Sequence, residues 1–443
     1  MNKLNCYVQN YKWGCKGYNS IISNYLIGQN SNIECDKEYA EFWMGTHING
    51  ESKIYINNSN SILYNSDYIN ENTIKLTKYL KHNNIYNDNN NQLPYLFKIL
   101  SIEKPLSIQV HPSKPKAIEL NKKYPDIYKD NKEKPELAIA LDNNFQMFYG
   151  LKTIDNLCNY INKFVILKEI LKKHLKFNID CFMEFFNLKE KDNNKLYKSY
   201  LDLIIEILNL DKEALKEVLL SLINSKEQYF YNENNKNNQI TIEYLVNEFG
   251  YDNGILFCLM MNYVVLNKGE SIYITENIPH SYIRGNIIEC MINSDFVIRL
   301  GLTCKNKDIS NFVKILEEEF NKLIENDNLD KNINGYENID LNNDEFNNCI
   351  CKIFKIPNVK EFKVLYFKGN LINYKFDKCS ILLVVNIDSS NDDSNNLYIS
   401  ANMNGNVINI KRYETYFLDY ENNIEFKSNN GLNFELYVSS GIY

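Results

Sequence analysis

The sequence predicts a mainly β protein that carries a helical insertion within its first β domain and has a second β domain after it. Short strand-like runs fill residues 94–141 and return over residues 271–300. Between them apolar residues recur with a helical period, and β-rich runs follow again over residues 353–438. This order predicts a first β domain at 1–152 and 254–325, a helical domain at 153–253 and a C-terminal β domain at 345–443.

Three apolar stripes, each built on spacings of three and four residues, define the helical insertion. Asp211 stands just before the third stripe, where its carboxylate can accept hydrogen bonds from the free amides of a helix start. Four asparagine-dense stretches lack any apolar period and are predicted to be surface loops or domain boundaries: 83–92, 232–239, 326–348 and 386–396. The stripes are Ile161, Phe164, Val165, Leu167, Ile170 and Leu171; Tyr200, Leu203, Ile204, Ile207 and Leu208; and Leu215, Val218, Leu219 and Leu222.

The composition of the 443-residue chain is that of a globular protein, with 44% hydrophobic and 24% charged residues. These values exclude collagen-like, coiled-coil and wholly disordered chains, and a net charge of −7 argues against a general nucleic-acid binder. We expect a cytoplasmic protein with reduced thiols, because the eleven cysteines are odd in number and contain no CxxC pair. We expect no membrane association, because no apolar run approaches the roughly 18–20 residues that span a bilayer.

The segment from Leu106 to His111 alternates apolar and polar side chains, as a strand with one buried face does. Ser107, Gln109 and His111 would therefore share one face and could form the wall of a pocket. An ordinary strand with one solvated face would show the same alternation.

Two further polar residues stand at points where the backbone is restrained. Glu136 opens a strongly apolar strand directly after Pro135, and His280 follows Pro279 at the end of another strand. Taken alone, His280 could be a simple loop histidine. Together with Gln109 and His111, these residues offer nitrogen and oxygen donors without a thiolate, which is typical of a catalytic rather than a structural divalent-metal site.

Charged residues are also embedded in the hydrophobic run from residue 287 to 305. Burying Glu289 and Arg299 without partners would be costly, so they either pair with each other or face a wet cavity. A purely structural pair is one interpretation. In the other, Arg299 and Lys305 form a clamp for a phosphate group.

Eight segments in chain order resemble the type I phosphomannose isomerases (mannose-6-phosphate isomerases). These segments cover most of the first 150 residues and the region from roughly 255 to 310. They are Val8-Gln-Asn-Tyr-Lys-Trp-Gly14, Tyr39-Ala-Glu-Phe-Trp-Met-Gly-Thr-His47, Leu93-Pro-Tyr-Leu-Phe-Lys-Ile-Leu-Ser101, Leu106-Ser-Ile-Gln-Val-His-Pro112, Lys134-Pro-Glu-Leu-Ala-Ile-Ala-Leu141, Pro279-His-Ser-Tyr282, Ile288-Glu-Cys-Met291 and Arg299-Leu-Gly-Leu-Thr303.

The resemblance implies a cupin-type jelly roll, a helical domain and a second jelly roll. It implies an isomerase that interconverts mannose 6-phosphate and fructose 6-phosphate through an enediol(ate) and feeds GDP-mannose synthesis, acting as a monomer on this phosphorylated hexose. By residue-to-residue match, one Zn²⁺ would be held by Gln109, His111, Glu136 and His280. Arg299 takes the place of the catalytic arginine, with Lys134 and Glu289 as candidates for proton transfer. The expected substrate contacts are Lys98, Ser107, Tyr282, Asp295 and Lys305.

The chain departs from the family pattern just before the predicted metal ligand Glu136. The family commonly has Asn-His-Lys-Pro-Glu there, whereas this chain has Lys132-Glu-Lys-Pro-Glu136, so that Glu133 replaces a histidine. Two alternatives stay open at this point. One is an Fe(II)-dependent cupin oxygenase, and the other is a cupin that binds a sugar phosphate without turning it over.

Overall fold

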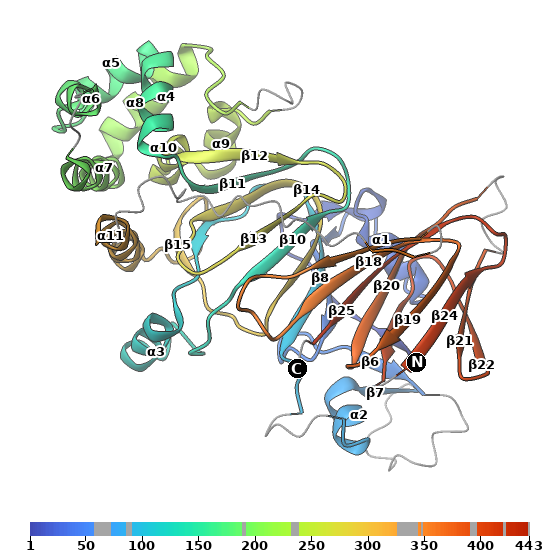
Figure 1. The fold of residues 1–443 in the computed structure, drawn as a ribbon. Helices are drawn as coiled ribbons and strands as arrows, with labels where there is room; N and C mark the ends of the chain where they lie inside the picture. The colour runs from blue at the N-terminus through green and yellow to red at the C-terminus, as the bar shows by residue number, and fades with distance from the viewer. Residues whose placement is uncertain are drawn as a thin grey trace.

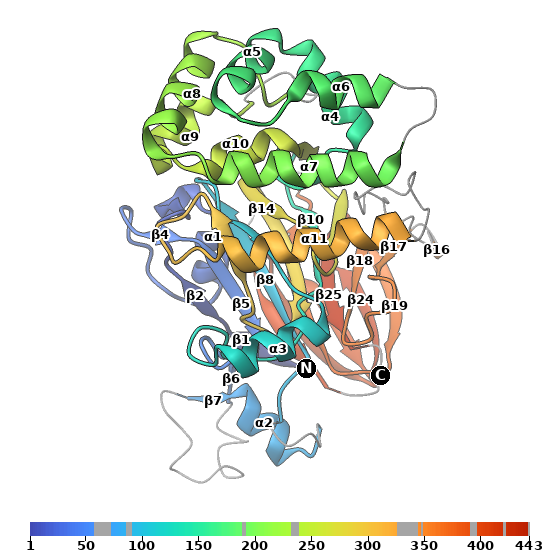
Figure 2. The same ribbon diagram turned by 90° about the vertical axis from the view of Figure 1, so that its left-hand side faces the viewer.

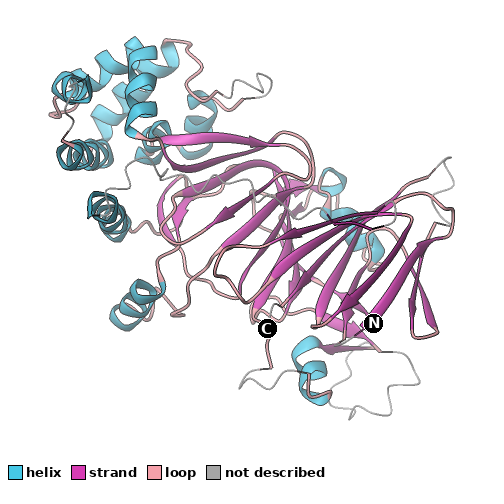
Figure 3. Cartoon of the chain, viewed as in Figure 1, coloured by secondary structure: helices cyan, strands magenta, loops and turns pink. Residues whose placement is uncertain are grey.

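A computed structural model describes residues 1–56, 72–85, 91–187, 192–231, 239–325, 344–346, 349–389, 397–419 and 422–441. Within these ranges, helices and strands are segregated, with a cluster of helices at one end of a body of antiparallel sheets (Figures 1 and 3). The chain is therefore a mixed helix-and-sheet protein with antiparallel sheets, whereas the sequence predicts a mainly β protein with a helical insertion. The exact domain bounds stay a prediction.

The first large sheet has ten strands, and its strand pairs are antiparallel. It is built from residues that precede α4 (Ile154–Lys163) and residues that follow α9 (Ile242–Phe249) in the chain. Its strands are β2 (Tyr7–Gln9), β5 (Glu41–Gly45), β8 (Tyr95–Ile102), β9 (Ile108–Val110), β10 (Glu136–Ala140), β11 (Phe145–Leu151), β12 (Met261–Leu266), β13 (Ser271–Ile274), β14 (His280–Ile292) and β15 (Ile298–Gly301).

Strand β14 joins the parts of this sheet, because it pairs with β9 and β11 near its start and with β8 and β10 further along. The strand changes partners at Gly285, whose φ of 114° is a conformation that side chains with a Cβ rarely adopt. A Cβ there would lie 3.1 Å from the Cα of Phe145. Glycine therefore allows one long strand to carry His280 at one end and Glu289 near the other.

The second large sheet has nine strands and packs against a four-stranded sheet as a sandwich, with a shared apolar core that includes Leu382, Phe426 and Leu436. The nine strands are β16 (Asp344–Phe346), β17 (Cys349–Phe354), β18 (Lys363–Gly369), β25 (Phe434–Ser440), β20 (Ser380–Ile387), β23 (Thr415–Leu418), β1 (Asn2–Asn5), β6 (Lys53–Tyr55) and β7 (Thr73–Lys75). The four are β19 (Leu371–Phe376), β24 (Asn422–Ser428), β21 (Ile399–Met403) and β22 (Asn406–Ile410).

The N-terminal strand β1 belongs to this second sheet and not to the first. It lies between β23 and β6, with Asn2 opposite Phe417 and Leu4 opposite Ile54. An apolar cluster containing Phe42, Ile99, Phe417 and Tyr437 then joins the two large sheets. The two β regions are consequently continuous in structure, which a division by chain position alone did not predict.

Most of the helices form a layer over one end of the first sheet, and α11 runs across the sheet edge below them (Figure 2). Smaller elements complete the β body: β3 (Cys15–Lys16), β4 (Glu38–Tyr39), η1 (Gly17–Asn19), α1 (Ile22–Gly28), α2 (Leu76–His82) and α3 (Lys114–Lys123). The layer consists of α4 (Ile154–Lys163), α5 (Val165–His174), α6 (Ile179–Asn187), α7 (Asn193–Leu208), α8 (Lys212–Asn224), α9 (Ile242–Phe249) and α10 (Asn253–Met260). The helix below it, α11, spans Ile309–Glu325.

Two of the three predicted apolar stripes are buried on single helices, α7 and α8. Asp211 caps α8, since its side chain accepts hydrogen bonds from the backbone amides of Glu213 and Ala214. The first stripe does not form one helix, because the chain leaves helical geometry at Phe164, between α4 and α5. The Phe164 ring packs on Tyr160, while Val165, which the sequence places on the same apolar stripe, is 60% exposed.

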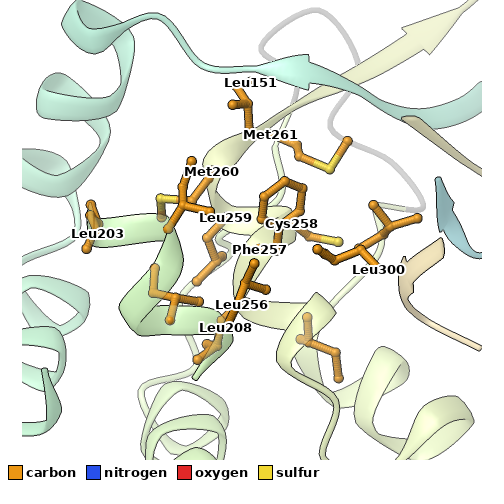
Figure 4. Close-up of a cluster of buried hydrophobic side chains, with 14 of the residues drawn as sticks. Leu151, Leu203, Leu208, Leu256, Phe257, Cys258, Leu259, Met260, Met261 and Leu300 are labelled. Atoms are coloured by element: carbon orange, nitrogen blue, oxygen red, sulfur yellow. The ribbon is translucent and has the colours of Figure 1, made fainter. Parts of the chain in front are cut away.

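The helical layer packs on the first sheet through α10, which is buried from Gly254 to Met260 (Figure 4). Residues Leu256 to Met261 are surrounded by Leu203 and Leu208 from α7, Leu151 from β11 and Leu300 from β15. Since α10 leads directly into β12, the covalent connection and the apolar contacts act at the same place.

Three predictions from composition concern the surface loops, the thiols and the lipid bilayer. The asparagine-dense loops lie largely outside the described residues, which omit 86–90, 232–238, 326–343, 347–348 and 390–396. All eleven cysteines are free, as predicted. Among the helices described, none is both long and apolar enough to cross a lipid bilayer.

Candidate active site

Three of the four predicted metal ligands converge inside the first sheet. His111 follows β9, Glu136 opens β10 and His280 opens β14, and their donor atoms all lie within 4.8 Å of one another. Nε2 of His111 is 3.2 Å from Oε1 of Glu136, and Nε2 of His280 is 3.7 Å from Oε2. All three residues are at most 1% exposed.

The backbone fixes the orientation of both imidazoles from behind. Nδ1 of His111 is 2.8 Å from the carbonyl oxygen of Phe296, and Nδ1 of His280 is 2.9 Å from that of Ile278. A carbonyl oxygen only accepts, so each ring carries its proton on Nδ1 and turns the lone pair of Nε2 toward Glu136. This is the arrangement that neutral histidine ligands require.

The donor atoms of these three side chains are suited to bind a divalent cation, and they are not satisfied by hydrogen bonds to one another. Although buried, Nε2 of His111, Nε2 of His280 and Oε2 of Glu136 make no hydrogen bond within the described part of the chain. Buried polar atoms without partners are rare and costly, and a bound metal would satisfy all three at once. Two imidazoles and a carboxylate are a donor set that Zn²⁺ accepts.

The pKa values of the three groups favour the metal-binding protonation states. Burial opposes ionisation of Glu136, but Lys134 and the two histidines outweigh it and hold the pKa of that carboxyl well below its usual range. Burial, together with the neighbouring His111, lowers the pKa of His280 to about 3. Burial also lowers the pKa of His111. The site therefore offers a carboxylate and two neutral imidazoles near neutral pH.

Gln109 is brought next to this group by strand register. It is the cross-strand partner of His280 on β14 and of Arg299 on β15. Strand β9 is shorter than predicted and ends at Val110, so that His111 lies just beyond it. Ser107 and Gln109 line the adjacent cavity, whereas His111 is fully buried.

A cavity of about 640 Å³ opens beside the three donors. Its wall combines residues of β5, β8, β14 and β15 with Glu248 and Phe249 at the end of α9, so that the helical layer contributes to the rim. Apart from the two histidines, the structure brings every predicted site residue to this wall: Lys98, Ser107, Gln109, Lys134, Glu136, Tyr282, Glu289, Asp295, Arg299 and Lys305.

Lys98 is held between two carboxylates in the cavity wall. It is the cross-strand partner of Glu289 and forms an ion pair with it, and Oε2 of Glu41 lies 3.5 Å from its Nζ. Burial disfavours the ammonium, but the nearby carboxylates outweigh this and raise the pKa of Lys98. Burial, and then the charge of Glu136, raise the pKa of Glu289. Glu289 is thus a buried carboxyl poised closer to neutral pH than a surface glutamate.

Arg299 and Lys305 contribute positive charge to the cavity wall. The Nζ of Lys305 lies 5.4 Å from the ring centroid of Tyr11. Burial lowers the pKa of Arg299, and burial and then Arg299 lower the pKa of Lys305. Two partly buried cations that repel each other gain most from a bound dianion, which is the electrostatic requirement of a phosphate site.

Glu133 does not face this cavity. It lines a separate pocket of about 440 Å³ together with Thr275, Glu276 and residues 356–361. Lys134 touches both pockets, and its Nζ lies 2.8 Å from Oε1 of Glu136. The residue that replaces the family histidine is therefore separated from the cavity that holds the other predicted site residues.

Sequence reasoning assigned no role in the site to Glu41. This carboxylate is 8% exposed, pairs with Lys98 and accepts a hydrogen bond from the indole of Trp43 at 2.7 Å. The sequence signal that could have found it is a single acidic residue in an otherwise apolar strand, β5, in which every residue is buried.

Fold and site together define a metal-binding protein with antiparallel sheets, in which a His-Glu-His group lies beside a charged cavity. Residues 1–154 match the family model described as phosphomannose isomerase type I, catalytic domain. The chain is 34% identical over 327 residues to mannose-6-phosphate isomerase of Candida albicans, covering 71% of each chain. It is 32% identical over 320 residues to mannose-6-phosphate isomerase 2 of Arabidopsis thaliana, covering 71% of this chain and 70% of the relative.

The solved structures agree with this at the level of the fold. A crystal structure of mannose 6-phosphate isomerase from Salmonella typhimurium, bound to substrate and zinc, superimposes with a TM-score of 0.73 at 22% identity, covering all of both chains. On the sequence relationships, the chain belongs to the mannose-6-phosphate isomerase family.

Proposed function

We propose that the protein is a zinc-dependent aldose–ketose isomerase that interconverts mannose 6-phosphate and fructose 6-phosphate and feeds GDP-mannose synthesis. The observation that carries the proposal is the convergence of His111, Glu136 and His280 with buried donor atoms that lack hydrogen bonds among the described residues. Gln109, the cross-strand neighbour of His280, would be the fourth ligand. The family membership adds support from sequence.

We further propose that the first sheet and the C-terminal sandwich are two cupin-type jelly rolls, with the helical domain inserted in the first. This division is supported by the chain order, because α4 to α10 lie between β11 and β12, which are neighbouring strands of the first antiparallel sheet. Eleven free thiols support a cytoplasmic location. Action as a monomer stays a prediction.

The reaction moves a proton between C1 and C2 of the open-chain sugar. In the enediol(ate) formed during this transfer, negative charge develops on the oxygens of C1 and C2. When bound, Zn²⁺ supplies a Lewis acid and a template for sugar oxygens. Arg299 would stabilise the developing charge from the cavity wall. Ser107 and Lys305 would hold the phosphate, while Lys98, Tyr282 and Asp295 would contact the sugar.

Glu289 is the better-placed of the two candidates for proton transfer. It reaches the cavity wall, and burial raises its pKa toward the working pH, as a general base requires. Lys134 is engaged with Glu136, where its positive charge keeps the metal ligand ionised. Lys134 would thus support the metal site rather than move the proton.

A coupled assay of purified protein with mannose 6-phosphate, run beside zinc analysis, tests the proposal. Gln109→Ala and His280→Ala should each lose bound zinc and activity together. Arg299→Ala should keep the metal while turnover falls by a factor of about 10² or more. Full zinc occupancy in both ligand variants would contradict the metal site. Oxygen consumption with Fe(II), in the absence of isomerase activity, would favour an oxygenase instead.

A further inference from the structure

His47 and Asp295 form a pair at the rim of the cavity. His47 lies just after β5, is 4% exposed and packs edge-on against the ring of Trp43, with ring centroids 4.9 Å apart. Its Nε2 is 3.2 Å from Oδ1 of Asp295. Asp295 lines the cavity and His47 does not, so any effect of His47 on a ligand must pass through Asp295.

The surroundings of His47 determine which ring nitrogen carries the proton. The backbone amide of Asn49 donates to Nδ1 at 3.2 Å, and an amide N–H can only donate. Nδ1 must therefore present its lone pair, which leaves the proton on Nε2, directed at the Asp295 carboxylate. The imidazole thus has one defined tautomer and one defined recipient for its proton.

The Asp295 carboxylate is restrained at both oxygens. The side-chain amide of Asn49 donates to Oδ2 at 2.9 Å, while His47 faces Oδ1. The hydrogen bond from His47 is the largest influence on this group and lowers the pKa of the Asp295 carboxyl, with smaller contributions from Lys134 and Lys98. The carboxylate is therefore kept ionised and in one orientation while its side chain stays 52% exposed.

Hydrogen bonds fix the backbone at Asp295 and connect the next residue to His111, one of the proposed metal ligands. Asp130 accepts hydrogen bonds from the backbone amide of Asp295 at 2.8 Å and from the hydroxyl of Ser294 at 2.9 Å. The next residue, Phe296, places its carbonyl oxygen against Nδ1 of His111. A sugar that contacts Asp295 would therefore be located relative to the metal site by a short, restrained segment.

We propose that His47 is a positioning residue, which through its Nε2 proton directs the Asp295 carboxylate toward a hydroxyl of the bound sugar phosphate. The proposal deepens the proposed function and rests on it. Asp295 makes the contact with the substrate, and His47 acts only through Asp295. The expected substrate hydroxyl donates to the carboxylate, since an ionised carboxyl can only accept.

Two variants at position 47 separate the hydrogen bond from the packing. His47→Phe keeps a ring against Trp43 but removes the donor, whereas His47→Gln keeps a side-chain N–H that can reach Asp295. We expect His47→Phe to raise KM for mannose 6-phosphate on the order of 10-fold, with a smaller change in kcat, and His47→Gln to recover most of that loss. In an Asp295→Asn background, His47→Phe should add almost nothing. His82→Phe, at an exposed position on α2, is the matched control and should match wild type.

Histidine-selective ¹⁵N NMR gives a readout that does not depend on turnover. The chain has five histidines, so the His47 signal can be assigned by its loss in His47→Phe. The expected result is an Nε2-protonated ring whose shifts change in Asp295→Asn. An Nδ1-protonated ring, an unchanged KM in folded His47→Phe, or no recovery in His47→Gln would each overturn the proposal. A wild-type protein inactive on mannose 6-phosphate would refute the proposed function instead, with the NMR result unaffected.

Discussion

Replacing Lys98 by methionine should destabilise the protein strongly, because among the described residues Lys98 is the one positive partner within ion-pair distance of Glu289. The side chains of Lys98 and Glu289 are only 7% and 3% exposed, and Glu41, the second carboxylate beside Lys98, is also buried. Methionine has a similar length and fills the same space. The substitution therefore changes charge much more than packing.

The expected loss follows from leaving two carboxylates buried without a counter-ion. Breaking a buried ion pair on one side typically costs about 3–5 kcal/mol of unfolding free energy. Glu41 retains the indole N–H of Trp43, which limits its share of the cost. Glu289 has a pKa already raised by burial, so it can take up a proton, and the loss should shrink as the pH is lowered. The double variant Lys98→Met with Glu289→Gln should recover to within about 2 kcal/mol of wild type.

Urea unfolding of the zinc-loaded protein, followed by tryptophan fluorescence, measures these differences. The two tryptophans, Trp13 and Trp43, both line the cavity, so the signal reports on the region that contains the substitution. Lys37→Met is the control, because Lys37 pairs with Glu34 at 2.8 Å with both side chains exposed, and its loss should stay below about 1 kcal/mol. A Lys98→Met loss below about 1 kcal/mol, or no recovery in the double variant, would refute the reasoning.

Three further predictions concern other parts of the molecule. In metal-free protein the unfolding free energy should fall as the pH drops from about 6.5 toward 3, by up to about 1.4 kcal/mol per pH unit for His280 alone. The reason is that His280 takes up a proton in the unfolded state over this range, whereas its lowered pKa keeps it neutral in the folded state. Urea titrations of His280→Phe should show a flatter pH dependence. Gly301→Ala should cost about 1–3 kcal/mol in thermal unfolding, since its Cβ would lie 2.6 Å from Oδ1 of Asp252 at the start of α10. Asp211→Ala should cost about 1 kcal/mol by removing the cap of α8, with Asp211→Asn losing less in the same measurement.

The local sequence pattern was enough to predict helices, a helix cap and a strand, because these depend on residues that are close together in the chain. The stripes on α7 and α8 and the cap at Asp211 follow from helical spacing and from hydrogen bonding over three residues. The strand opened by Glu136 follows from an apolar run after a proline. The convergence of the histidines with Glu136 was predictable mainly through the resemblance to a family, because spacing alone does not bring distant segments together.

Features that depend on strand register were beyond sequence reasoning. Glu41 lies beside Lys98 because Trp43 is the cross-strand partner of Lys98, and side chains two residues apart share a face. The break at Phe164 reflects packing against Tyr160 and Tyr229, which competes with helix continuation. The role inferred for His47 likewise depends on the β14–β15 connection lying next to the end of β5.

The position of β1 between β6 and β23 has a consequence for biosynthesis. About 410 residues separate Asn5 from Thr415, so at roughly 5–20 residues per second a ribosome needs on the order of 20–80 seconds to make the second neighbour of β1. During that time one side of β1 exposes backbone groups that can pair with another chain. Nascent chains stalled before residue 415 should accordingly be held by chaperones or aggregate, even though every proposed metal ligand has already been synthesised.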